Sequence, residues 1–327
     1  MTAPEQPTLP TVDDVNQARA RIAGRVHRTP LSTATMLGAL LDPPVALWLK
    51  EEQRQKTGAF KVRGVLNRLG TLTPEQRARG LVTVSAGNHA QAVAWAASAE
   101  GLGATVVMRS AASPVKVAAT RGYGAAVDLS PEDNAAAFEL ARELERERGL
   151  TFIPPFDDPM VVAGQGTVGA EVLDDLPDAD VVIVPVGGGG LISGIALAIK
   201  ERRPATRVIG VEPAGSQAVT LALAAGHPVA AGAPDTIADG LAAPFTGDLN
   251  LRLIQRYVDE VVLVTDDDLR QAMRLLLERA KLLAEPAGAA GLAALVAGKV
   301  AGTTGQKVVV VVSGGNTDVA RLAALLG

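Results

Sequence analysis

The sequence predicts an α/β protein built on a mostly parallel sheet that helices cover on both faces. Short apolar runs rich in β-branched residues alternate with longer helical patterns through most of the 327 residues. Runs such as 181–184 and 308–312 are continuously apolar, and no repeat or low-complexity linker interrupts the alternation. Continuous apolar strands joined by helices are typical of parallel sheets buried on both faces. A (βα)8 barrel would show the same alternation, so periodicity alone leaves it open.

The expected elements follow from caps and from local composition. A first helix should begin near Asp13 and end at Gly24, because these residue types favour helix termini. Pro154–Pro159 is a candidate crossing between domains, although a surface loop explains it equally well. β-Branched runs predict strands at 45–49, 81–84, 104–108, 125–129, 151–153, 181–186, 207–211, 260–264 and 307–312, and helices between them include 131–148, 266–283 and 286–297.

Composition excludes several classes of function. The net charge is −4 with acids and bases mixed along the chain, so neither a nucleic-acid surface nor attraction to anionic lipid is expected. The absence of cysteine excludes disulfides, thiolate catalysis and cysteine–metal sites, and fits a cytoplasmic protein. No apolar run is long enough to cross a membrane, and residues 1–10 lack the apolar core of a signal peptide. The length suits two domains or one large one.

A glycine-rich connection follows the 181–186 strand and precedes a segment that looks helical. Backbone without side chains can approach a ligand closely, and its N–H groups would face one point suited to a phosphate dianion. The spacing has one residue too many for G-x-G-x-x-G, although Glu212 at the end of the next strand keeps a nicotinamide-dependent oxidoreductase open. The connection consists of Gly187, Gly188, Gly189 and Gly190.

Two further loops follow apolar strands. One offers a hydroxyl, an amide and backbone donors suited to a carboxylate, but Ser85 or Asn88 could equally cap the next helix. The other begins with Ser313, which would lie at the carboxyl edge of the sheet, where open α/β sheets bind ligands. A serine used only for turn geometry is an equal alternative there. The two loops are Ser85-Ala86-Gly87-Asn88-His89 and Ser313-Gly314-Gly315-Asn316.

Lys61 is the candidate reactive lysine. It lies between Phe60 and Val62, close to a helix start preceded by Gly58. The helix dipole and burial would both favour the neutral amine that a Schiff base requires. Most of the eight lysines look like solvated ends of helices or strands. On chemistry alone, a surface lysine remains the simpler interpretation of Lys61 as well.

Together, these motifs resemble the fold-type II enzymes that depend on pyridoxal 5′-phosphate (PLP). Within that group they are most similar to threonine dehydratases (threonine ammonia-lyases) and serine racemases. The resemblance implies a tryptophan synthase β-like fold, with two open, twisted, mostly parallel sheets and helices on both faces. It covers nearly the whole chain through the segments 59–64 (AFKVRG), 85–91 (SAGNHAQ), 187–190 (GGGG), 285–289 (EPAGA) and 313–316 (SGGN).

The resemblance also implies a role for each motif residue. Lys61 would carry PLP as a Schiff base and move the Cα proton, while Phe60 packs on the pyridine ring. Asn88 would hydrogen-bond the ring 3′-oxygen, the glycines at 187–190 would hold the phosphate, and Ser313 would face the ring nitrogen. A serine is too weak an acid to protonate pyridine, which disfavours a long-lived carbanion. The substrate carboxylate would be bound by Ser85, Ala86, Gly87 and His89.

The domain organisation and assembly follow from the same resemblance. Residues 1–79 and 156–327 would form a large PLP-binding domain, and residues 80–155 a small mobile domain carrying the substrate-carboxylate loop. Closure of the small domain would exclude water from the reaction. The partner would be a small amino-acid substrate, and the chain would assemble into a homodimer or homotetramer.

The implied activity is that of a threonine ammonia-lyase, a PLP-dependent lyase. L-Threonine, and also L-serine, would be dehydrated to an aminoacrylate and hydrolysed to 2-oxobutanoate or pyruvate plus ammonia. A serine racemase and a 3-hydroxyaspartate dehydratase are the alternatives. Ala86 replaces the acid/base serine of eukaryotic racemases, which disfavours racemisation. Ala218 stands where their divalent-metal site, after Glu212, needs a second carboxylate, so we expect no metal site.

Overall fold

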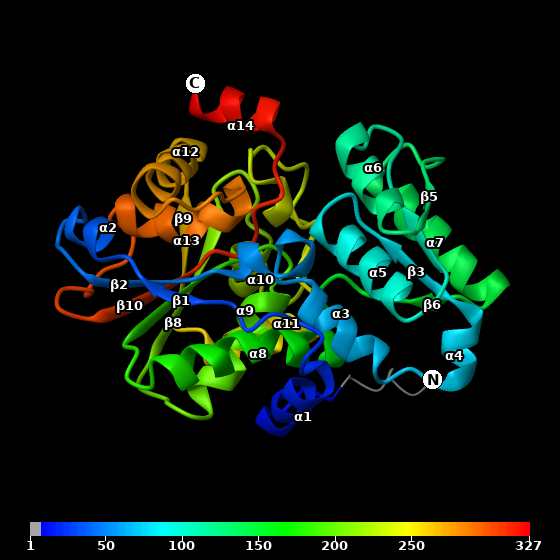
Figure 1. The fold of residues 1–327 in the computed structure, drawn as a ribbon, viewed down its shortest axis with the longest axis horizontal. Helices are drawn as coiled ribbons and strands as arrows, with labels where there is room; N and C mark the ends of the chain where they lie inside the picture. The colour runs from blue at the N-terminus through cyan, green and yellow to red at the C-terminus, as the bar shows by residue number, and fades with distance from the viewer. Residues whose placement is uncertain (1–7) are drawn as a thin grey trace.

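The computed structural model describes residues 8–327, so residues 1–7, which include most of the segment assessed for a signal peptide, lie outside it. The predicted α/β fold with two mostly parallel sheets is confirmed (Figure 1). One sheet has six strands in the order β1 (Leu31–Thr33), β2 (Ala46–Lys50), β10 (Lys307–Val311), β7 (Val181–Pro185), β8 (Arg207–Pro213) and β9 (Glu260–Val264). The other has four, in the order β5 (Ala126–Asp128), β4 (Ala104–Val107), β3 (Leu81–Val84) and β6 (Thr151–Phe152).

Every predicted strand is present within two residues of its expected bounds, and all neighbouring pairs are parallel except β1 with β2. The sequence did not predict β1, because it has three residues, two of them polar, and lies at an edge. The continuously buried pattern of β7, β10 and β3 agrees with parallel strands covered on both faces.

The helices are α1 (Val12–Ile22), α2 (Thr35–Ala39), α3 (Val62–Leu69), α4 (Pro74–Arg79), α5 (Asn88–Ala99), α6 (Pro114–Gly122), α7 (Asn134–Arg148), α8 (Pro159–Asp175), α9 (Gly190–Lys200), α10 (Ala218–Ala225), α11 (Asp248–Tyr257), α12 (Asp266–Leu275), α13 (Pro286–Val296) and α14 (Val319–Leu326). Short helical turns are η1 (Glu52–Arg54), η2 (Lys56–Gly58), η3 (Asp239–Leu241) and η4 (Leu276–Ala280).

Two helix boundaries differ from the expected ones. The first helix agrees with expectation, since it starts at Val12, next to Asp13, and Gly24 follows its C-cap residue. The helix expected over 131–148 begins only at Asn134, because Asp133 caps it. The helix expected over 266–283 is α-helical only to Leu275 and continues as the single π turn η4. That turn ends at Lys281, whose positive φ of 59° reverses the chain before α13.

Helices cover both faces of each sheet. On the six-stranded sheet, α2, α12 and α13 share an apolar core with one face, while α8 and α9 pack on the other (Figure 1). On the four-stranded sheet, α5 and α6 lie on one face and α7 on the other. The carboxyl ends of β3, β7 and β10 lead directly into the serine and glycine loops singled out above. In the described part of the chain, no helix is long and apolar enough to cross a membrane.

Candidate active site

Lys61 is partly buried at the N-terminal end of α3, where it occupies the N-cap position. A tight turn precedes it, with positive φ at both Thr57 (63°) and Gly58 (72°). Its Nζ donates a hydrogen bond to the carbonyl of Pro155 at 2.7 Å and lies 5.1 Å from the centre of the Phe60 ring. Burial lowers the pKa of Lys61 to about 8. The surface-lysine interpretation is therefore wrong, and the lowered pKa increases the fraction of neutral amine at physiological pH.

The segment that carries Lys61 runs beside the loop after β10. The backbone N–H of Phe60 donates to the carbonyl of Ser313 at 3.1 Å. Ala59 and Gly314 form an isolated antiparallel bridge. Ser313 itself is buried at the carboxyl end of the central strand β10. The structure thus brings the predicted lysine and the predicted serine together across more than 250 positions of sequence.

The glycine loop lies between β7 and α9 and is packed against Phe156. A Cβ at Gly188 would lie 2.5 Å from the Phe156 ring, and one at Gly190 would lie 2.9 Å from the Phe156 carbonyl oxygen. Gly189 has a φ of 91° and caps α9 without any side-chain hydrogen bond. Asn250 Nδ2 holds the loop by donating to the Gly188 carbonyl at 2.9 Å. The first N–H groups of α9 therefore remain open to an anion.

In the loop after β3, neither Ser85 nor Asn88 caps α5. Gly87 is the N-cap residue, and no side chain bonds to the first turn. The Ser85 hydroxyl instead accepts from the Gly87 N–H at 3.1 Å. Because the capping explanation fails, the loop keeps its backbone donors at a helix N-terminus, an arrangement suited to a carboxylate.

His89 belongs to the same loop, but its ring faces the protein interior. The side chain is buried, and its Nε2 is 3.1 Å from the carbonyl oxygen of Ile153. Burial and the charge of Lys61 lower the pKa of His89 to about 3, so the imidazole is neutral. His89 can therefore contribute to the loop through its backbone N–H rather than as a cation.

Asn88 is the first residue of α5, and its side chain meets residues from two distant segments. Its Nδ2 donates to Glu285 Oε1 at 2.5 Å, and its Oδ1 accepts from Asn316 Nδ2 at 2.8 Å. Glu285 caps α13 and is buried, which raises the pKa of its carboxyl group to about 7. Glu285 and Asn316 were part of the sequence motifs, but no role was predicted for either of them. Their membership of these motifs is the one sequence signal that points to them.

A buried ion cluster, defined as Lys50, Glu52, Arg63 and Glu171, lies directly behind the start of α3. Arg63 bridges the two carboxylates, with Nη2–Oε1 of Glu52 at 2.8 Å and Nη1–Oε1 of Glu171 at 2.7 Å. Lys50 Nζ is 2.6 Å from Glu171 Oε2. Burial opposes ionisation of Glu171, but Arg63 and Lys50 outweigh it and hold its pKa below the ordinary value. The cluster anchors the helix that begins one residue after Lys61.

An exposed ion cluster, defined as Lys116, Asp239 and Arg321, links three separate elements. Lys116 on α6 pairs with Asp239 on η3. Arg321 on α14 also contacts Asp239, at 3.2 Å, and donates to the Ile237 carbonyl at 2.8 Å. Burial opposes ionisation of Asp239, yet Lys116 and Arg321 lower its pKa. This cluster is a direct connection between the helices of the four-stranded sheet and those of the six-stranded sheet.

Glu212, considered above as a ribose or metal ligand, is engaged within the protein. Its carboxylate accepts from the N–H groups of Val219 and Thr220, both at 2.8 Å, at the start of α10. Burial raises its pKa. The first residue of α10 is Ala218, which offers no ligand. Among the described residues, no group of three or more His, Cys, Asp or Glu side chains is arranged to hold a metal ion.

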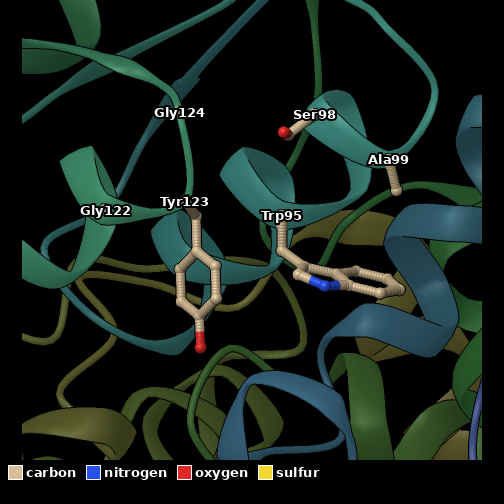
Figure 2. A pocket seen from close by; sticks show the side chains of 6 residues that line it. All are labelled: Trp95, Ser98, Ala99, Gly122, Tyr123 and Gly124. Atoms are coloured by element: carbon tan, nitrogen blue, oxygen red, sulfur yellow. The ribbon is translucent and has the colours of Figure 1, made fainter.

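A surface hollow of about 290 Å³ lies apart from these loops (Figure 2). It is formed by the C-terminal half of α5 and the end of α6, and none of the predicted site residues lines it. The indole of Trp95, beside the hollow, has the ammonium of Lys56 5.3 Å from its centre. The lining residues are Trp95, Ser98, Ala99, Gly122, Tyr123 and Gly124.

The class of the protein follows from the fold and these loops. Residues 22–314 match the pyridoxal-phosphate dependent enzyme family, and the chain belongs to this family. The match overturns the nicotinamide-dependent alternative, as does the use of the Glu212 carboxylate inside the protein. It also explains why a lysine, a glycine loop and a serine meet at the carboxyl edge of one sheet.

More specific similarity comes from individual proteins. The L-threonine ammonia-lyase of Thermotoga maritima is 43% identical, over 94% of this chain and 76% of that protein. A phenylserine dehydratase of Ralstonia pickettii is also 43% identical, over 100% of this chain and 99% of that protein. Among solved structures, maize serine racemase has a TM-score of 0.92 at 38% identity and covers 97% of both chains.

The residues of the site fit PLP. The loop at 187–190 lacks the Cβ atoms that would collide with Phe156 and leads into the uncapped N-terminus of α9, as a phosphate dianion requires. Lys61 offers an amine with a lowered pKa. Ser313, a neutral hydroxyl, lies within the same group of loops. PLP is thus the cofactor of this protein both by family membership and by the character of its site.

Proposed function

We propose that this protein is a PLP-dependent threonine ammonia-lyase, which converts L-threonine, and also L-serine, to a 2-oxo acid and ammonia. The observation that carries the proposal is Lys61, whose amine has a pKa of about 8 and donates to the Pro155 carbonyl, and whose segment runs beside the Ser313 loop. The names of relatives such as the threonine ammonia-lyase of Thermotoga maritima support this choice of substrate.

The cofactor would be held by residues from separate segments. Lys61 is the proposed attachment point, Phe60 packs on the pyridine ring, and Asn88 donates to the ring 3′-oxygen. Ser313 faces the ring nitrogen, and the phosphate is bound by Gly187, Gly188, Gly189 and Gly190. When bound, PLP withdraws electrons from the substrate Cα. The neutral Ser313 hydroxyl leaves the ring nitrogen unprotonated, which moderates this withdrawal and favours prompt loss of the β-hydroxyl group.

Lys61 is also the proposed base that removes the Cα proton. A base works best when its pKa is near the working pH, and the value of about 8 meets this condition. The substrate carboxylate is bound by the backbone of Ser85, Ala86, Gly87 and His89 and by the Ser85 hydroxyl. Since the His89 ring is neutral, the helix N-terminus and the loop N–H groups supply the attraction to the carboxylate.

The loop residue Ala86 distinguishes elimination from racemisation. Racemisation needs a second acid/base group on the face of the substrate opposite Lys61, and a methyl side chain transfers no proton. We therefore propose that any racemase activity toward serine is slow relative to dehydration. The similarity to a phenylserine dehydratase makes a β-aryl serine a second candidate substrate, to be tested beside threonine.

Closure and assembly complete the proposal. Residues 80–155, which include the four-stranded sheet, would act as a small mobile domain on a large domain formed by 1–79 and 156–327. The exposed ion cluster supports this division because Lys116 on α6 reaches across to Asp239. Closure would exclude water while Lys61 acts. We also propose a homodimer or homotetramer, as the resemblance to the family implies, and a cytoplasmic location, which the absence of cysteine fits.

The test is 2-oxo acid release by the PLP-loaded protein. L-Threonine, L-serine, D-serine, 3-hydroxyaspartate and threo-phenylserine are offered separately to the wild type, Lys61→Ala and Lys56→Ala. We expect fastest release from L-threonine, a loss of about 10³-fold or more in Lys61→Ala, and less than about threefold change in Lys56→Ala. Lys56 is a matched control, because it lies five positions away on η2 and contacts Trp95. Absence of oxo acid from every substrate, with PLP bound, would contradict the proposal.

A further inference from the structure

We infer that Asn316 is a positioning residue that fixes the orientation of the Asn88 side-chain amide. The inference rests on the proposed contact between Asn88 and the ring oxygen of PLP. Asn316 lies in the loop after β10, and Asn88 begins α5, so the two residues come from elements of different sheets. Their side chains meet across 228 positions of sequence. Asn316 thereby connects the serine loop with the residue proposed to hold the ring oxygen.

The hydrogen bonds of Asn316 fix which end of its amide faces Asn88. Its Nδ2 donates to the backbone carbonyl of Thr57 at 2.7 Å and to Asn88 Oδ1 at 2.8 Å. Both amide hydrogens of Asn316 are thus used on acceptors. One of these acceptors, the Thr57 carbonyl, belongs to the main chain, and a main-chain carbonyl oxygen can only accept a hydrogen bond. Asn316 must therefore present a donor, not an acceptor, to Asn88.

This donor determines the orientation of the Asn88 amide in turn. With Oδ1 facing Asn316, the Nδ2 group faces Glu285 and donates to its Oε1 at 2.5 Å. An amide nitrogen carries two hydrogens, so one remains without a partner among residues 8–327. That hydrogen is the donor a ring oxygen needs. Rotating the amide by 180° would present Oδ1 to the carboxylate and to the ring oxygen, and the acceptors would then repel one another.

Two glycines provide the space that this arrangement occupies. A Cβ at Gly58 would collide with Asn316 Oδ1, and one at Gly314 would collide with Glu285 Oε1 and lie 3.1 Å from Asn88 Nδ2. Gly58 also needs its positive φ of 72°, which an alanine rarely adopts. The backbone on both sides of the three side chains is therefore shaped to admit them. This packing leaves room for the three side chains, and the hydrogen bonds set the direction of the amide.

Glu285 makes the orientation sensitive to charge. Burial raises the pKa of its carboxyl group to about 7, the hydrogen bond from Asn88 opposes this rise, and Asp239 on η3 adds to it. Lys116 on α6 and Arg321 on α14 act in the opposite direction. An acceptor placed at position 316 would turn the Asn88 oxygen toward Glu285, which would tolerate it only in the protonated form.

The experiment compares Asn316→Asp and Asn316→Ala with the wild type. Asn316→Asp has nearly the same shape but presents an acceptor to Asn88, whereas Asn316→Ala removes the contact without adding charge. Two quantities are measured: the affinity of the apoprotein for PLP by fluorescence titration, and the midpoint pH of the absorption band of the loaded protein. We expect about tenfold weaker PLP binding in both variants, and a midpoint raised by about one pH unit in Asn316→Asp.

A matched control is available in Asn67→Asp. Asn67 is buried on α3, accepts from Arg21 and donates to the Met160 carbonyl at 2.6 Å, so the substitution removes one buried donor away from the site. It should lower the melting temperature while leaving PLP affinity and the midpoint pH unchanged. A merely structural role for Asn316 would give the same pattern, and would overturn the inference.

The outcomes separate this inference from the proposed function. A loaded wild type together with unchanged PLP affinity and midpoint in both Asn316 variants would overturn the role of Asn316 alone. A wild type that takes up no PLP would overturn both proposals. If Asn316→Asp yields no folded protein, Asn316→Ala decides the matter, because it adds no buried charge. Tenfold weaker binding in Asn316→Ala would support the inference, and unchanged binding would overturn it.

Discussion

The two ion clusters that flank the site have similar chemistry and opposite surroundings. In the buried ion cluster, Lys50, Glu52 and Arg63 are each 0% exposed, and two cations balance two carboxylates. In the exposed ion cluster, the side chains of Lys116 and Asp239 are 23% and 42% exposed, and two cations share one carboxylate. The first lies behind Lys61 and joins β2, η1, α3 and α8. The second connects elements that belong to different sheets.

This difference shows that burial, rather than the number of ion pairs, determines what a cluster contributes. A buried pair is matched to its partners because an uncompensated charge there has no water to solvate it. An exposed pair loses little when it separates, because water and salt replace the partner. The buried cluster therefore fixes the helix that begins directly after Lys61, the proposed reactive lysine. The exposed cluster can form and break at low cost, as the proposed closure of residues 80–155 requires.

The largest expected effect on the free energy of unfolding concerns the buried ion cluster. Replacing Arg63 by methionine leaves Glu52 buried without its cation, so the free energy of unfolding should fall by about 3–5 kcal/mol. Urea denaturation of the apoprotein measures it. Neutralising the stranded carboxylate in the double variant Arg63→Met/Glu52→Gln should recover part of the loss. A loss below about 1 kcal/mol in Arg63→Met would show that burial does not set the contribution of this cluster.

A second effect concerns Glu285, whose pKa responds to the charges of the exposed cluster. Burial raises this pKa from 4.5 to about 7, so protonated Glu285 favours the folded state. Its contribution is fully present below pH 4.5 and is lost as the pH rises through 7. Glu285→Gln should remove about 3 kcal/mol of the pH dependence of unfolding across this window. Denaturation curves of the apoprotein at several pH values measure it, and parallel pH dependences in variant and wild type would exclude it.

The smallest effect is expected at the exposed cluster. Lys116→Met should lower the free energy of unfolding by about 0.2–1 kcal/mol, and the difference should shrink as salt is raised from about 0.05 to 0.5 M. Arg63→Met is the matched substitution on the buried side, and its loss should persist in high salt. Urea denaturation at the two salt concentrations provides the comparison. If salt changed the loss of unfolding free energy equally in both variants, the proposed difference between the buried and the exposed ion cluster would be wrong.

Much of the fold could be predicted because its strands are short, continuously apolar and β-branched, as β10 and β7 show. The strand β1 could not, because pairing with β2 rather than its own composition makes it a strand. Lys50 shows another limit. It directly follows the strand predicted at 45–49, where a solvated lysine is expected, but it is buried because Glu171, 121 positions later, neutralises it.

For the candidate site, local sequence motifs predicted the segments involved, but they did not predict which side chains would contact one another. Motif resemblance predicted the segments of Lys61, Asn88 and Ser313, and the structure brings these segments together. The partners of Asn88 could not be derived from spacing, since Glu285 is 197 positions away and its contact depends on how two sheets meet. Local sequence can nominate a polar residue, but the direction in which its amide points depends on tertiary packing.

The central place of β10 in the large sheet has a consequence for synthesis of the protein. On the ribosome, β2 and β7 are made long before residues 307–311, yet β10 lies between them. Until that strand emerges, each neighbour has an unpaired backbone edge, which is prone to join other chains. Translation stopped before this point would therefore yield an aggregation-prone chain with a gap in its sheet. A pause in translation just upstream would lengthen the time for which the nascent chain needs a chaperone.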